Sequence, residues 1–107
     1  MAPLVAREIG VEKAREYVRG LRENDIAVRQ AYLFGSFANG SPDADSDIDI
    51  AVFLDRDEID GFDEGVRLTR LRRGIDVRIE PHVFTRKDLE DVDPVISEIL
   101  RTGRRID

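Results

Sequence analysis

The sequence predicts an α/β protein in which a small mixed or mostly parallel sheet is flanked by helices. Three observations lead to this fold class. Some segments repeat apolar residues in steps of three and four, which is typical of amphipathic helices. Other segments are short and rich in β-branched and aromatic residues, which is typical of strands. The two kinds of segment alternate along the chain in the order α-β-turn-β-α-β-α, and such alternation favours a layered α/β structure.

Three helices are expected. Residues 7–23 carry apolar side chains in helical spacing, with charges between them. Residues 57–73 form a second helical pattern, although two glycines weaken it. A third helix is expected over residues 94–102, because Asp93-Pro94 combines a capping side chain with a proline that suits a first helical turn. Its expected inward residues are Val95, Ile96, Ile99 and Leu100.

Three strands are expected between these helices. They cover residues 26–34, 47–54 and 75–84, and the last is interrupted or bulged at Pro81, which cannot donate a backbone hydrogen bond. Gly35-Ser36 turns the chain after the first strand, and residues 37–39 then have room for one helical turn.

Composition excludes several classes of protein. At 107 residues and 41% hydrophobic, residues 1–107 are expected to form one domain. The net charge of −6 argues against an extensive nucleic-acid surface. With no cysteine and a single histidine, any metal would be held by oxygen ligands, which suits Mg²⁺, Mn²⁺ or Ca²⁺. No stretch is typical of a signal peptide or a membrane span, so we expect a cytoplasmic location and no membrane partner.

The most unusual stretch is DIDIAVFL, where carboxylates alternate with apolar residues at the start of a strand. Asp47 and Asp49 share one face with Ala51, while Ile48, Ile50 and Val52 share the other. The two aspartates lie about 6.6 Å apart along a strand, close enough to share bound divalent ions. The alternative is an edge strand whose outer face is solvated.

A calcium loop is a further alternative, because Asp43, Asp45 and Asp47 match the first ligand positions of an EF-hand. The match fails at Ile48 and Leu54, where that loop requires glycine and glutamate. Asp43 and Asp45 are therefore expected in a solvated loop.

Gly35-Ser36 supplies a candidate anion site. A turn that leads from a strand into a helix start exposes backbone N–H groups, and a neighbouring hydroxyl adds a further donor. A phosphate site opposite a carboxylate pair is the arrangement that metal-dependent phosphoryl or nucleotidyl transfer requires.

A third carboxylate is expected from the segment 75–80. There Asp76, Arg78 and Glu80 would alternate on one face of a strand, and either acid could face Asp47 and Asp49. We favour Asp76 because it directly follows a helix-ending glycine. Arg78 would balance the acidic cluster, contact a phosphate, or form a surface ion pair with Asp76 or Glu80. His82 carries no specific signal.

The spacing from Gly35-Ser36 to Asp47-Ile48-Asp49 resembles the signature of the DNA polymerase β-like nucleotidyltransferase superfamily, and the chain length is similar to its minimal (MNT) branch. The resemblance implies the polymerase β-like fold. It further implies that Gly35 and Ser36 bind a nucleoside triphosphate, that Asp47, Asp49 and Asp76 bind two Mg²⁺ ions, and that the Asp76 position helps to activate the attacking hydroxyl. Many relatives have arginine where this chain has Asn39, so one cation near the phosphates is missing.

The same resemblance implies a biological role. Minimal members act as antitoxins of HEPN toxins, and some transfer AMP from ATP to a toxin tyrosine. A partner of HEPN type and a homo- or hetero-oligomer are therefore expected. The alternatives are a catalytically silent antitoxin that neutralises its partner by binding alone, and transfer to a small molecule. The sequence leaves open the nucleotide base and the acceptor.

Overall fold

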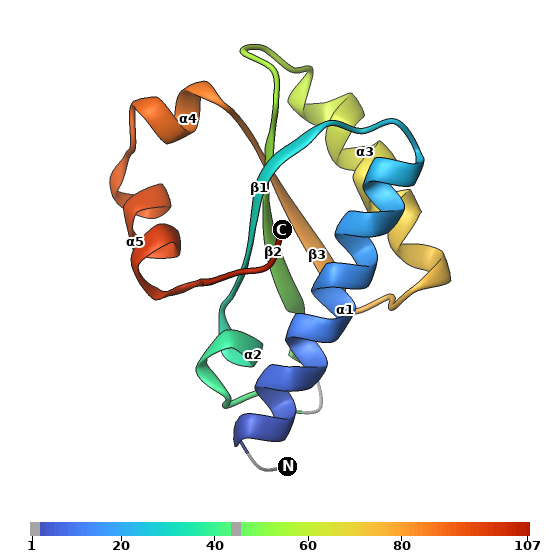
Figure 1. Ribbon diagram of the computed structural model, residues 1–107, viewed down its shortest axis with the longest axis vertical. Helices are drawn as coiled ribbons and strands as arrows, with labels where there is room; N and C mark the ends of the chain where they lie inside the picture. Colours follow the sequence, from blue (N-terminus) through green and yellow to red (C-terminus); the bar gives the residue numbers. More distant parts are fainter. Residues whose placement is uncertain (1–2, 44–45) are drawn as a thin grey trace.

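The computed structural model describes residues 3–43 and 46–107, and its centre is a four-stranded mixed sheet with the strand order β3-β2-β1-β4 (Figure 1). Strand β1 is antiparallel to both β2 and β4, whereas β2 and β3 are parallel. The strands are β1 (Val28–Phe34), β2 (Ile48–Leu54), β3 (Ile79–Thr85) and β4 (Arg104–Arg105). The expected mixed α/β architecture is confirmed.

Helices cover both faces of this sheet. The long helix α1 and helix α3 lie on one face, and the shorter α4 and α5 lie on the other (Figure 1). The one-turn helix α2 follows β1 directly and packs against α1. The helices are α1 (Pro3–Glu23), α2 (Ser36–Asn39), α3 (Gly61–Leu71), α4 (Lys87–Glu90) and α5 (Pro94–Thr102), with a 3₁₀ turn at Arg72–Gly74.

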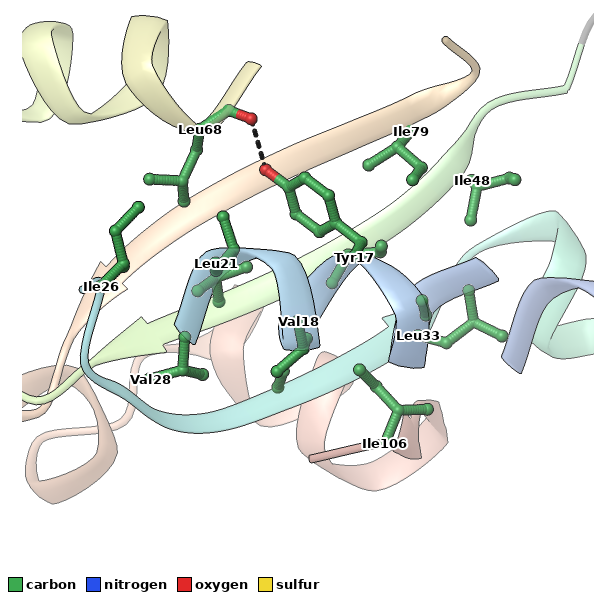
Figure 2. Close-up of a cluster of buried hydrophobic side chains, with 14 of the residues drawn as sticks. Tyr17, Val18, Leu21, Ile26, Val28, Leu33, Ile48, Leu68, Ile79 and Ile106 are labelled. Atoms are coloured by element: carbon green, nitrogen blue, oxygen red, sulfur yellow. Dashed lines mark hydrogen bonds between the residues drawn. The ribbon is translucent and has the colours of Figure 1, made fainter. Parts of the chain in front are cut away.

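The larger hydrophobic core lies between the sheet and the pair α1/α3 (Figure 2). Tyr17 of α1 is fully buried there, and its hydroxyl donates a hydrogen bond to the backbone carbonyl of Leu68 in α3. Burial raises the pKa of Tyr17 well above its ordinary value. The smaller core lies under α5, where Ile96 and Ile99 contact Ala51 and Phe53 of β2.

Local capping explains where the helices begin and end. Asp60 and Asp93 accept backbone hydrogen bonds at the starts of α3 and α5, as capping aspartates do. Helix α1 ends in a Schellman motif, in which the N–H of Ile26 bonds to the carbonyl of Leu21. Asp25 takes the left-handed conformation of that motif at φ 61°.

The sequence-based boundaries are correct at both ends of α5 and at the C-terminal ends of α1, β1 and β2, and they differ elsewhere. Helix α1 begins at Pro3 instead of residue 7, and α3 begins at Gly61, directly after its Asp60 cap, instead of residue 57. The third strand begins at Ile79 and not at residue 75, because the preceding residues form turns. The short elements α4 and β4 were not expected, since neither is long enough to show a period.

One expected core residue is exposed. Val95 of α5 was assigned to the inward face, but its side chain is 65% exposed, whereas Ile96 and Ile99 are buried. Across the described residues, no helix combines the length and apolar character needed to cross a membrane.

We predict that Tyr17→Phe lowers the free energy of unfolding by about 1 kcal/mol at neutral pH, because the buried Leu68 carbonyl loses its donor. Above pH 10 the two proteins should converge. The unfolded chain releases the Tyr17 proton there while the folded chain keeps it, so the wild type loses about 1.4 kcal/mol per pH unit relative to the variant. Urea titrations between pH 7 and pH 11 measure both effects, and a pH-independent difference would contradict the assignment.

Candidate active site

A row of three side chains crosses the sheet at the start of β2. Asp49 is paired with Phe34 of β1 and with Glu80 of β3, and residues paired in this way point to the same face. Asp49 is also the only residue of β2 that is not buried. The row therefore places two carboxylates side by side at an exposed rim of an otherwise buried strand.

Gly35 lies directly against Asp49. Its backbone has φ 76° and ψ −154°, a region that is essentially reserved for glycine. A Cβ atom at this position would come within 2.5 Å of the Asp49 Oδ2 atom. The turn after β1 and the carboxylate of β2 are thus fitted to each other, which explains in physical terms why a glycine stands here.

His82 provides a second contact to the same carboxylate. Its Nε2 atom lies 3.1 Å from Asp49 Oδ1. The imidazole also makes an edge contact with the Phe34 ring, with a centroid separation of 4.9 Å. His82 thus orients Asp49 from β3, and sequence reasoning missed it because a lone histidine has no pattern.

Asp47 lies immediately before β2 and is exposed. The expected alternation is confirmed for the strand itself, since Ile48, Ile50 and Val52 enter the larger core while Ala51 enters the smaller one. The alternative of an edge strand is wrong, because β2 lies between β1 and β3.

The expectation that Asp76 shares a strand face with Glu80 is wrong. Asp76 lies in a turn before β3, where its carboxylate accepts hydrogen bonds from the backbone and the guanidinium of Arg78. The Arg78 hydrogen bond holds the pKa of Asp76 below its ordinary value, and Lys13 of α1 contributes to the same lowering. Asp76 is thus bound to Arg78 and lies outside the row of paired residues that contains Asp49. The surface ion pair considered for Arg78 is the one observed.

The remaining expected residues belong to the segment between β1 and β2. Ser36 begins α2, and the first N–H groups of a helix have no partner within it. Asp43 forms a turn with Ser46, whose hydroxyl lies 3.2 Å from Asp43 Oδ1 and accepts the Asp43 N–H at 2.8 Å. Asp45 lies outside the described residues.

The donor set suits Mg²⁺, although the side chains do not close around a site as they stand. Within residues 3–43 and 46–107, no three acidic or histidine side chains are arranged to hold a metal. Mg²⁺ is commonly bound by one or two carboxylates together with waters and substrate phosphates, and not by a complete protein cage. Asp47, Asp49 and Glu80 offer hard oxygen donors at an accessible rim, so these residues fit that kind of ion.

A glycine turn beside carboxylates at one rim of a mixed sheet is the architecture of a nucleotidyltransferase. The chain belongs to the family described as "Polymerase beta, Nucleotidyltransferase", whose model matches residues 16–106. The expected polymerase β-like fold is therefore confirmed. No curated protein matches the chain.

Solved structures show the same fold. A candidate nucleotidyltransferase from Sulfolobus solfataricus is 23% identical, with a TM-score of 0.64 over 87% of this chain and 82% of that one. A toxin–antitoxin structure with AMP-PNP is 24% identical, with a TM-score of 0.63 over 87% and 72% of the two chains. A mutant of the toxin–antitoxin MntA–HpeT is 22% identical, with a TM-score of 0.61 over 86% and 70%. At these identities the similarity establishes the fold alone.

We predict that Gly35→Ala destabilises the protein by about 1–3 kcal/mol, because an added Cβ meets both an unfavourable backbone conformation and Asp49. Gly65→Ala is the matched control. Gly65 lies inside α3 with open space around it, so this variant should be more stable than the wild type by about 0.5–1 kcal/mol. Urea unfolding measures both changes, and equal stability of the two variants would contradict the close fit.

Proposed function

We propose that this protein is a Mg²⁺-dependent nucleotidyltransferase that transfers AMP from ATP to a hydroxyl group. The observation that carries the proposal is the row of carboxylates beside Gly35. Asp49 of this row is the only residue of β2 that is not buried. The row places the carboxylates of Asp49 and Glu80 side by side. A bound divalent cation would offset the repulsion between these two like charges.

Each residue has a distinct role in the proposed reaction. Gly35 and Ser36 bind the phosphates through the turn and the start of α2, while Asp47 and Asp49 bind the ion. When bound, Mg²⁺ offsets the negative charge that develops on the phosphate oxygens. The acceptor hydroxyl attacks the α-phosphorus, a new P–O bond forms, and the bond to the bridging oxygen breaks to release pyrophosphate.

Glu80 is the third carboxylate of this proposal, in place of the favoured Asp76. The pairing of β2 with β3 places Glu80 beside Asp49 on one face of the sheet. The Asp76 carboxylate is instead hydrogen-bonded to Arg78. Glu80 is exposed and is therefore free to accept the proton of the attacking hydroxyl.

The proposed acceptor is a tyrosine of a partner toxin of HEPN type, which makes the protein an antitoxin. The similarity in fold to the antitoxin-containing structures supports this part of the proposal. Neutralisation by binding alone is the competing role, and the next experiment separates the two.

We predict that Asp47→Asn abolishes transfer of labelled AMP to a partner toxin of HEPN type, because the ion loses a charged ligand. Asp91→Asn, at an exposed position after α4, is the matched control and should retain wild-type activity. If Asp47→Asn still neutralises the toxin without any labelling, the binding-only role is correct.

We predict that Glu80→Gln lowers the transfer rate by about a hundredfold or more, whereas Asp76→Asn changes it little. Asp76→Asn should instead lower thermal stability, since it removes the charge partner of Arg78. Rates measured across a Mg²⁺ titration, together with melting curves, test both variants. If only Asp76→Asn lost transfer, Asp76 and not Glu80 would be the third carboxylate.

A further inference from the structure

A cavity of about 750 Å³ lies between the sheet and α5, directly beside the carboxylate row. We call it the α5 slot. One wall consists of Phe34 from β1 and of His82 and Phe84 from β3, and the opposite wall includes Val95 and Ile99 of α5. Its volume is within the range of about 300–1,000 Å³ that is usual for small-molecule sites.

The walls of the α5 slot suit a flat, uncharged group. Phe34 and His82 form an edge contact, and Phe84 stacks on Phe53 at a centroid distance of 5.0 Å, so the sheet side is an aromatic surface. Val95 is 65% exposed and adds apolar area from α5. Among the described residues that line the slot there is no lysine or arginine, and its one acidic residue, Glu98, forms an ion pair with Arg101. Polyphosphate is therefore disfavoured inside the slot, whereas a nucleobase could stack there.

The α5 slot is continuous with the proposed phosphate and metal residues. Gly35 and His82 both line the slot. Gly35 also lies against Asp49, and His82 contacts the same carboxylate. Asn39 of α2 borders the slot on the side of the phosphate turn. A nucleotide whose phosphates lie at Gly35 and Ser36 would thus have its sugar and base directed toward α5.

From this placement we infer that the α5 slot binds the nucleoside part of the triphosphate substrate, with the base stacked on the Phe34–Phe84 wall. The inference rests on the proposed function. It adds the site by which the protein would bind a nucleoside triphosphate in preference to a polyphosphate without a nucleoside. It also accounts for the exposed position of Val95, which faces a ligand and not the core.

The absence of tryptophan from the chain makes this inference directly testable. Val95→Trp places a single indole in the α5 slot on an exposed helical position, and Val66→Trp places one on α3, over the opposite face of the sheet. With Mg²⁺ present, ATP should quench the emission of Val95→Trp, and inorganic tripolyphosphate should not. Neither compound should change the emission of Val66→Trp.

Calorimetric measurement of the affinities for ATP and for tripolyphosphate provides a second test. The wild type should bind ATP roughly tenfold more tightly than tripolyphosphate, since stacking contributes to ATP alone. Phe84→Leu keeps most of the apolar volume and removes an aromatic face outside the carboxylate row, so it should lose most of this preference while its affinity for tripolyphosphate is unchanged.

The outcomes distinguish the inference from the proposed function. If the wild type binds ATP and tripolyphosphate equally and the emission of Val95→Trp does not change, the α5 slot does not bind the nucleoside. The proposed phosphate site would be unaffected by that result. Quenching that appears only when the acceptor protein is added also overturns it, because the slot would then hold the acceptor. If neither compound binds the wild type, both proposals are wrong.

Discussion

The central position of β2 is the constraint on which the rest of the site depends. This strand is hydrogen-bonded to β1 on one side and to β3 on the other, and helices cover it on both faces. Six of its seven residues are buried, so a charged side chain is tolerated only where the covering layer ends. Asp49 occupies that place. Because β2 is held on both sides, the position of Asp49 is fixed by the whole sheet and not by a flexible loop, which is how precise sites are built.

The turn after β1 is fitted to this carboxylate and is held in turn by α1. Gly35 lies against Asp49, and α2 follows at once. Helix α1 approaches α2 closely on the other side. A Cβ atom on Gly10 of α1 would lie 3.0 Å from the Cβ atom of Phe37 in α2. Arg7 of α1 donates a hydrogen bond to the carbonyl of Ala38 at 2.9 Å. The turn after β1 is thereby supported from both the sheet and the long helix, and two glycines make the close contacts possible.

Antiparallel pairing on one side of β2 and parallel pairing on the other gives the site its residues from three strands. Phe34, Asp49 and Glu80 form one row, and His82 reaches back to Asp49 from the next row. The same face continues under α5 as an aromatic surface. Chemistry at the rim and recognition in the α5 slot would therefore share one sheet face, while the opposite face serves packing against α1 and α3.

The sequence by itself determined the α/β class, the Gly35-Ser36 turn, the alternation around Asp49 and the bounds of α5, because periodicity and capping are local properties. Only the tertiary structure decided which acid stands beside Asp49. Strand register is set by packing across the sheet, and the turn that ties Asp76 to Arg78 delays the start of β3 until Ile79. The contact of His82 with Asp49 and the exposure of Val95 likewise depend on neighbours that are distant in sequence. No local pattern encodes them, since they arise only when separate segments are brought together.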